Sequence, residues 1–249
     1  MTHPFEVNEE IELNATPEQV WEAISSGPGV DSWFMGHTEI EPREGGRGHM
    51  TLMGFTAHST VTAWEPGKRF AYRGDENPDG TFMAFEYIIE GREGSGTTLR
   101  FVHSGFLGDD WEAEYDALSK GDGMYLRKLA AYLEHFSGRT STSNLFAPGP
   151  QVADAERALR IVTAALGLTG TPAVGDSVTL GVDGLVPEEG IVVFADLPGS
   201  VIVVTRDALY TFIHGYQESV FVERHGFSDE ADAKKAEQAW QSWLSHAFA

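Results

Sequence analysis

His103 is the side chain best placed to take part in chemistry. It ends a run in which Leu99, Phe101 and His103 alternate with their neighbours, the period-two pattern that is typical of a β-strand. An imidazole on an apolar face can orient a carbonyl or hydroxyl group of a ligand, or accept a proton as a general base. The alternative is a histidine that only ends the strand beside Ser104.

Acidic side chains gather shortly after this strand, between residues 109 and 116. They could take part in acid–base chemistry or bind a cation, but acidic residues in the first turn of a helix also complement its dipole. The second interpretation needs no ligand and is the simpler one. The residues concerned are Asp109, Asp110, Glu112, Glu114 and Asp116.

The sequence pattern of residues 75–86 resembles that of a calcium-binding loop. Asp75, Asn77, Asp79, Gly80 and Glu86 stand where an EF-hand loop has its ligands and its glycine. The chain after Gly80 alternates like a strand, however, and a strand would carry Glu86 roughly 20 Å away at about 3.3 Å per residue. The segment is therefore predicted to be a polar hairpin turn. The remaining histidines lack metal-ligand spacing, and neither a phosphate-binding glycine loop nor a nucleophile elbow is present, so no metal and no cofactor are predicted.

Aromatic side chains give a stronger indication of function than the titratable ones. They recur on the elements that would surround a cavity in the first half, and methionine adds an adaptable wall. Such walls suit a planar or polycyclic apolar ligand, although the same side chains could also fill an ordinary core. The predicted ligand-binding residues are Trp33, Phe34, Met53, Phe55, Tyr72, Phe85, Tyr87, Phe101, His103, Phe106, Trp111, Tyr125 and Leu129.

The composition limits the kinds of partner. The chain of 249 residues has 17 basic and 38 acidic side chains, a net charge of -21 to which both halves contribute. Such a field repels phosphate backbones and anionic lipids, which argues against nucleic acid and membrane surfaces as partners, although acidity also serves solubility alone. The absence of cysteine excludes disulfides and thiolate chemistry. With no basic and apolar leader and no apolar run of membrane-spanning length, we expect a cytoplasmic protein.

The elements of the first half are marked by clear boundary signals. Thr16 and Gln19 form a capping box around Pro17, which predicts the start of a helix; Gly27-Pro28-Gly29 would end it, and a second short helix is expected over 30–35. A strand over 5–13 precedes them, six strands separated by Gly and Pro turns follow, and a long helix runs to Phe136. This order predicts an α+β domain with a curved antiparallel sheet around the long helix. The six strands are expected at 38–41, 48–55, 59–64, 69–73, 81–90 and 97–103.

The second half echoes the first. Residues 139–151 are rich in Ser, Thr and Pro without a period, which predicts a linker. Beyond it, 152–249 is predicted to be a shorter, degenerate copy, because the segment from Val220 to Phe227 resembles that from Leu99 to Phe106. The alternative is two unrelated segments that share a Gly-Phe pair. No strand is expected before the first helix of this copy, whose strands are expected at 176–182, 190–195, 200–205, 208–214 and 219–223.

The first half resembles the START/polyketide-cyclase-like (SRPBCC) superfamily, most closely the branch named after the activator of a heat-shock-chaperone ATPase. The resemblance covers about residues 5–137 and implies a helix-grip domain with an apolar cavity over residues 1–138. It implies little about reaction, because members include carriers, cyclases, resistance proteins and chaperone regulators. The motifs that carry it are Thr16-Pro17-Glu18-Gln19-Val20-Trp21, Trp33-Phe34, Pro66-Gly67-Lys68-Arg69-Phe70 and His103-Ser104-Gly105-Phe106.

The predicted function is the sequestration or transport of a hydrophobic, aromatic or polycyclic small molecule by the first half, without catalysis. The second half would then act as a lid, a packing partner or a homodimer contact. One alternative is a cyclase or dehydratase that acts on a polyketide-like substrate through His103 and an acidic partner; another is a chaperone-regulating interaction module. A carboxylate bound to His103 beside an open cavity would favour the enzyme, and a cavity without paired titratable groups the carrier.

Overall fold

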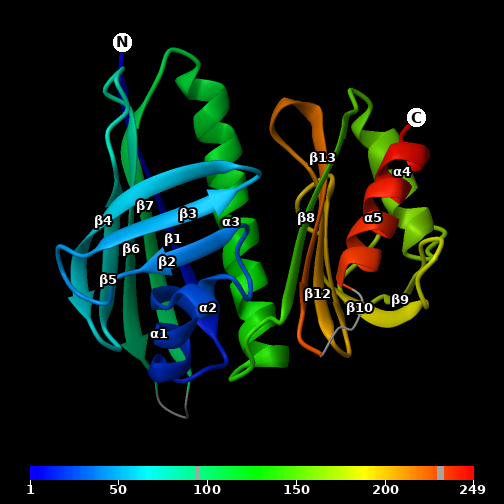
Figure 1. Cartoon of the computed structure of the whole chain (residues 1–249), viewed down its shortest axis with the longest axis horizontal. Coiled ribbons are helices and arrows are strands. Elements are labelled where there is room, and N and C mark those ends of the chain that lie inside the picture. Colours follow the sequence, from blue (N-terminus) through cyan, green and yellow to red (C-terminus); the bar gives the residue numbers. More distant parts are fainter. Residues whose placement is uncertain (93–95, 229–232) are drawn as a thin grey trace. The chain divides into compact units, whose positions relative to one another are not determined.

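The computed structural model describes residues 1–92, 96–228 and 233–249 of the chain (Figure 1). Contacts within the chain divide it into two compact units, Met1–Thr140 (unit 1) and Ser141–Ala249 (unit 2). Within the described ranges, no helix is both long and apolar enough to cross a membrane.

Unit 1 begins with β1 (His3–Leu13), α1 (Pro17–Ser25) and α2 (Gly27–Val30). The predicted capping box is present: the Thr16 side chain accepts from the backbone N–H of Gln19, whose side chain accepts from the N–H of Thr16. The second helix was expected over 30–35, and this was wrong. It starts at Gly27 because the Ser26 hydroxyl caps it by accepting from the N–H of Gly29, and Pro28 fits its first turn.

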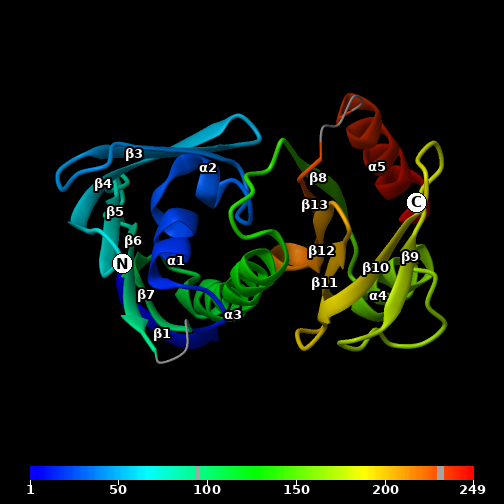
Figure 2. The same ribbon diagram turned by 90° about the horizontal axis from the view of Figure 1, so that it is seen from below.

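The sheet of unit 1 has seven antiparallel strands in the order β1-β7-β6-β5-β4-β3-β2. It curves around α3 (Trp111–Phe136), with α1 and α2 inside the same curve (Figure 2). The first strand therefore pairs with the last, which closes the unit beside the long helix. The strands after α2 are β2 (His37–Ile40), β3 (Arg47–Leu52), β4 (Phe55–Glu65), β5 (Arg69–Gly74), β6 (Phe82–Gly91) and β7 (Thr97–Leu107).

Three turns of this sheet bear on the predictions. The strand expected over 48–55 runs through a turn, because Met53 and Gly54 have left-handed backbone conformations, with φ of 51° and 82°, that reverse the chain between β3 and β4. Residues between Asp75 and Thr81 form a polar turn before β6, as predicted. The turn expected over 91–96 includes residues 93–95, which lie outside the described ranges.

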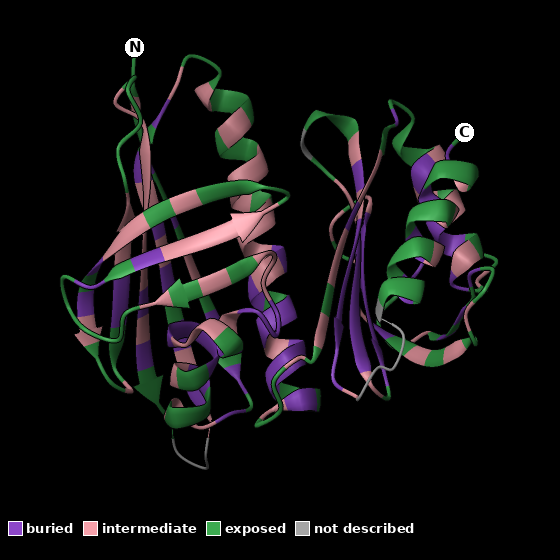
Figure 3. Cartoon of the chain, in the orientation of Figure 1, coloured by how far each residue is buried: buried purple, intermediate pink, exposed green. Residues whose placement is uncertain are grey.

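Helix α3 is buried unevenly along its length. Its second half, from Met124 to Phe136, carries all the buried side chains of the helix, whereas the turns before Gly121 are half-buried or exposed (Figure 3). Gly121 and Gly123 stand at the boundary on either side of Asp122, and each glycine weakens a helix interior by about 1 kcal/mol relative to alanine. The helix thus changes from loose to tight packing at Asp122.

Unit 2 is built by six antiparallel strands in the order β8-β13-β12-β11-β10-β9, with two helices. The linker predicted at 139–151 is wrong over most of its length, since β8 (Ser143–Gln151) pairs with β13 there. Its Pro148 and Pro150 obscured the strand, and they are tolerated because β8 is an edge strand. The remaining elements are α4 (Ala155–Ala165), β9 (Ser177–Leu180), β10 (Glu188–Phe194), β11 (Ser200–Thr205), β12 (Ala208–His214), a short 3-10 turn (Tyr216–Glu218), β13 (Ser219–Gly226) and α5 (Ala233–Ala247).

The two units have the same topology. In each, a first strand pairs with the last one, helical structure follows the first strand, a meander fills the sheet, and a helix ends the unit. Among the described residues, unit 2 has six strands against seven and one helix against two after its first strand. The prediction of a shorter second copy is confirmed, and the expectation that it lacks a strand before its first helix was wrong, because β8 is that strand.

Candidate functional site in unit 1

His103 lies in a row of aromatic side chains on the inner face of the sheet, the face that α3 covers. Tyr72 on β5 pairs across the strands with Phe85 on β6, which pairs with His103 on β7. The ring centroids of Tyr72 and Phe85 are 4.9 Å apart, and those of Phe85 and His103 are 4.2 Å apart, both pairs stacked. Phe5 on β1 meets the imidazole edge-on at 5.0 Å. The imidazole is therefore held between aromatic rings and is buried.

Asp122 on α3 hydrogen-bonds to this imidazole. The Nδ1 atom of His103 lies 2.9 Å from Oδ2 of Asp122, and their side chains are only 2% and 14% exposed. A carboxylate accepts hydrogen bonds, so Nδ1 carries the hydrogen of this contact. The other ring nitrogen, Nε2, is buried and has no hydrogen-bond partner among the described residues. A buried nitrogen of this kind costs about 1–3 kcal/mol until a partner satisfies it.

A second aromatic row runs beside the first. Phe70, Tyr87 and Phe101 pair across β5, β6 and β7, and Glu9 on β1 stands opposite Phe101. Tyr87 in this row and Tyr72 in the first row each carry a phenol on the inner face. Burial raises the pKa of both tyrosines, and the nearby Asp122 carboxylate raises each pKa further, so the phenols stay neutral.

Two carboxylates thus approach this face. Glu9 points to the same side as Val7 and Ile11, and its Oε1 atom would lie 3.9 Å from a Cβ atom on Gly123. Asp122 directly precedes Gly123 on α3, so the two acids approach the same part of the helix. Glu9 was not among the predicted site residues. The inner face therefore combines aromatic walls with one imidazole, two phenols and two acids.

The inner face of unit 1 is less completely covered than its counterpart in unit 2. Met83 and Phe85 on β6 are only half-buried. In unit 2, the corresponding strand β12 contributes Ala208, Tyr210 and Phe212, which are 1% exposed or less and pack with Trp240 of α5. Unit 2 is filled by its own aromatic side chains, whereas part of the aromatic surface of unit 1 stays open.

The structure places five of the thirteen predicted residues together in the two aromatic rows. They are Tyr72, Phe85, Tyr87, Phe101 and His103 itself.

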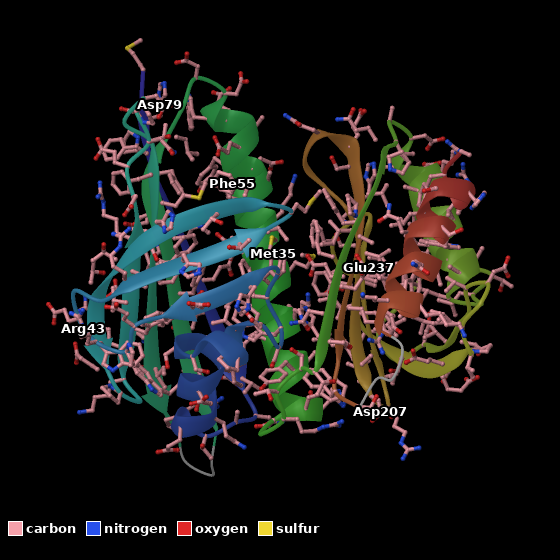
Figure 4. All side chains as sticks on the ribbon, viewed as in Figure 1. Met35, Arg43, Phe55, Asp79, Asp207 and Glu237 are labelled. Carbon is pink, nitrogen blue, oxygen red and sulfur yellow. The ribbon has the colours of Figure 1, made fainter. Side chains whose placement is uncertain are left out.

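Three others point elsewhere. Met53 lies in the turn between β3 and β4 and is 65% exposed. Phe55, labelled in Figure 4, begins β4 just after this turn. Its side chain is 71% exposed. Phe106 packs on Phe82 at 5.5 Å on the outer face, because it follows Gly105 on the alternating strand. These three do not wall the inner face.

The remaining predicted residues belong to the helices and their ends. Trp33 is buried after α2, where its indole N–H donates to the carbonyl oxygen of Ala23 at 2.9 Å. Phe34 meets Tyr125 of α3 edge-on at 4.7 Å, and Leu129 is fully buried one turn further along α3. Trp111, at the start of α3, stacks on His3 at 5.3 Å. These side chains pack α3 against the rest of unit 1.

In unit 2, an arginine takes the place of His103. Arg224 pairs across the strands with Tyr210 as His103 does with Phe85, and its Nε atom donates to the Tyr210 hydroxyl at 2.8 Å. That hydroxyl donates to Glu188 at 2.6 Å. In this register, His103 has no imidazole counterpart in unit 2.

Two side chains of the acidic run after β7 form ion pairs. Asp109 binds the N-terminal ammonium group at 2.7 Å, and Asp116 pairs with Lys120 one turn along α3. Asp75 of the calcium-like segment forms an ion pair with Arg47 at 2.7 Å. Among the residues described, no group of three or more His, Asp or Glu side chains is arranged to hold a metal ion.

A curved antiparallel sheet that grips a long terminal helix defines unit 1 as a helix-grip domain. Residues 14–134, all within unit 1, match the family described as "Activator of Hsp90 ATPase homolog 1-like protein". The predicted resemblance of unit 1 to the START/SRPBCC superfamily is therefore confirmed. No curated protein sequence matches the chain.

Several solved structures are similar in fold. Protein MLL2253 from Mesorhizobium loti is 22% identical over 53% of this chain and 99% of its own, with a TM-score of 0.47. The Aha1 dimer from Colwellia psychrerythraea is 23% identical over 52% of this chain and 96% of its own, with a TM-score of 0.44. BexL, a di-domain ARO/CYC protein from the BE-7585A biosynthetic pathway, is 15% identical over 98% of this chain and 99% of its own, with a TM-score of 0.49.

Proposed function

We propose that unit 1 binds a planar, hydrophobic small molecule on its aromatic inner face, with His103 as the polar anchor. The observation that carries this proposal is the buried Nε2 atom of His103, which lies among aromatic rings without a hydrogen-bond partner in the part of the chain that the structure describes. A ligand that supplies the partner removes an energetic cost and covers the open aromatic surface of Phe85.

The shape of the inner face supports a flat ligand. Two parallel aromatic rows cross β5, β6 and β7, and their members stack or tilt at centroid distances between 4.2 Å and 6.3 Å. Offset stacking between such rings and a ligand ring adds about 0.5–1.5 kcal/mol beyond the area that is buried. Met83, which is half-buried and unbranched, can move to admit a ligand.

A second candidate function, an enzyme of cyclase or dehydratase type, is favoured by one observation. The Asp122 carboxylate orients the imidazole of His103 through Nδ1, the arrangement that prepares Nε2 to accept a proton from a substrate. A carrier needs an anchor but no such oriented base. The two functions therefore differ in whether the bound molecule changes, not in where it binds.

Titration with N-phenyl-1-naphthylamine, a neutral apolar fluorophore, tests binding. We expect one saturable site per chain that Phe85→Leu weakens severalfold, because it removes a half-buried ring stacked on His103. The matched control is Phe106→Leu, which removes a ring from the outer face of the neighbouring strand and should leave the affinity unchanged. Absence of saturable binding, or equal losses in both variants, would refute the proposal.

Native mass spectrometry of the purified full chain separates the two functions. A co-purifying small molecule that is recovered unchanged after incubation supports the carrier. Conversion of that molecule, lost in His103→Leu, supports the enzyme.

A further inference from the structure

Asp122 determines which nitrogen of His103 carries the hydrogen. Its Oδ2 atom lies 2.9 Å from Nδ1, and a carboxylate can only accept, so Nδ1 is the donor. A neutral imidazole has a single N–H group, which leaves a lone pair on Nε2. The atom that faces a ligand is therefore a hydrogen-bond acceptor.

An acceptor at this place selects the chemistry of its partner. Carbonyl, ether and carboxylate oxygens have no hydrogen to give and would leave Nε2 unsatisfied, at the cost of a buried polar atom. Glu9 and Asp122, the two carboxylates of this face, repel an anion as well. A neutral ligand with a hydrogen-bond donor is the class that fits.

The neighbouring phenols favour a hydroxyl over an N–H group as that donor. Tyr72 and Tyr87 belong to the two aromatic rows beside His103. A ligand hydroxyl can donate to Nε2 and accept from a phenol at once, whereas the N–H group of a planar ring only donates.

Reaching Nε2 requires a side chain to move. This atom is buried, so the ligand displaces a neighbour as it binds. Met83 and Phe85 on β6 share the inner face with His103 and are both half-buried, which makes them the side chains with room to shift.

Resting on the proposed function, we infer that unit 1 is specific for planar ring systems that carry a hydroxyl group, phenolic or enolic, which donates its hydrogen bond to Nε2 of His103. The corresponding ether or ketone binds more weakly, although it has the same ring and nearly the same area. Asp122 is the positioning residue for this specificity, because it acts through His103.

Three probes with one ring system test the inference: 2-naphthol, 2-methoxynaphthalene and 2-acetonaphthone, each in competition with N-phenyl-1-naphthylamine on the full chain. We expect 2-naphthol to bind about tenfold more tightly than the other two, the effect of one satisfied hydrogen bond at a buried acceptor. In Asp122→Ala this preference should fall severalfold while 2-methoxynaphthalene keeps its affinity. Asp116→Ala, which removes an exposed acid from the same helix, should keep the preference.

The outcomes separate this inference from the proposed function. If the fluorophore binds but the three probes bind equally, or the ketone binds best, the inference is overturned and the binding function stands. If neither the fluorophore nor the three probes bind, both the inference and the proposed binding function are refuted. A hydroxyl preference that survives in Asp122→Ala overturns the role of Asp122.

A measurement on the wild-type chain covers the case in which Asp122→Ala does not fold. Long-range 15N–1H NMR spectra of the histidine rings should give His103 a protonated Nδ1 and an unprotonated Nε2, assigned by the signal that His103→Leu removes. Addition of 2-naphthol should shift the Nε2 resonance, and 2-methoxynaphthalene should not. A protonated Nε2 in the free protein would refute the inference directly.

Discussion

At the scale of single residues, a carboxylate on a helix holds an imidazole on a strand in one orientation. His103 and Asp122 are 19 positions apart, and their contact depends on how α3 crosses the sheet. The same pair serves as a ligand anchor or as an oriented base, and the hydroxyl of a bound ring would meet the same Nε2 atom in both cases. Binding specificity is therefore a property that both candidate functions share.

A second imidazole–carboxylate pair gives a prediction about pH and stability. His37 donates from Nδ1 to Asp31 at 2.7 Å, and this hydrogen bond raises the pKa of His37 above its ordinary value of 6.5. A raised histidine pKa means that the folded state holds its proton more tightly than the unfolded one. The stabilisation is thus complete below about pH 6.5 and is lost as the pH rises through the higher folded value.

His37→Gln should therefore flatten the decline of stability between about pH 6 and pH 8, as measured by urea unfolding midpoints. The change should be small, at the low end of about 0–1 kcal/mol, because His37 is 66% exposed. His135→Gln, an exposed histidine on α3, is the control and should leave the slope unaltered. A steeper decline in His37→Gln would contradict the assignment.

The sequence allowed His103 to be predicted but not its partner. His103 alternates with Leu99 and Phe101, so its face follows from the strand period. Asp122 stands between two glycines in a helix, which only marks a local weakness, and Glu9 looks like any acid on an alternating strand. Which acid meets the imidazole depends on the crossing of α3 over the sheet, and no local pattern encodes that crossing.

At the scale of elements, Gly105 permits β6 and β7 to pair next to His103. A Cβ atom at this position would lie 2.0 Å from the carbonyl oxygen of Phe82 and 3.2 Å from the Cα atom of Met83, and its φ is 150°. Both obstacles are backbone atoms, so no rotamer change relieves the clash.

Gly105→Ala should therefore destabilise unit 1 by more than about 2 kcal/mol and weaken fluorophore binding, because strands β6 and β7 must separate where His103 pairs with Phe85. Gly108→Ala is the matched control just beyond the end of β7, where a Cβ atom would meet nothing within 4 Å. Thermal unfolding of both variants checks this. Equal melting temperatures for the two would show that the strands adjust freely around Gly105.

The sequence predicted those elements that depend on a local pattern of neighbouring residues. The capping box at Thr16 and the alternation along β11 and β12 gave the right elements, because both depend on neighbouring residues alone. The prolines and the Ser/Thr-rich start of β8 are typical of loops and predict a linker; the segment is a strand because β13 pairs with it. The β3–β4 turn was missed because Met53, which is not a glycine, adopts the left-handed conformation.

At the scale of the whole molecule, one topology occurs twice with different interiors. The position of His103 is taken by Arg224 in unit 2, which donates to the Tyr210 hydroxyl; that hydroxyl donates in turn to Glu188, and Trp240 of α5 packs on the Tyr210 ring. Unit 2 thus has a polar side chain at the same position as unit 1, but its aromatic side chains are buried in the core. This contrast supports placing the ligand in unit 1 alone. It is the reason that we expect one saturable site per chain.

The net charge of -21 gives the last prediction. Like charges repel one another in the compact state, and this repulsion reaches about 30 Å at 0.01 M salt but only about 8 Å at 0.15 M. The ion pairs on the outer face of unit 1, such as Arg47 with Asp75 and Arg100 with Glu10, are exposed and contribute little to stability.

Raising sodium chloride from 0.01 M to 0.15 M should therefore raise the melting temperature by a few degrees in differential scanning fluorimetry, because weaker repulsion outweighs weaker ion pairs. Choline chloride at the same ionic strength should have the same effect, which excludes specific sodium binding. A fall in the melting temperature would show instead that the exposed ion pairs outweigh the repulsion.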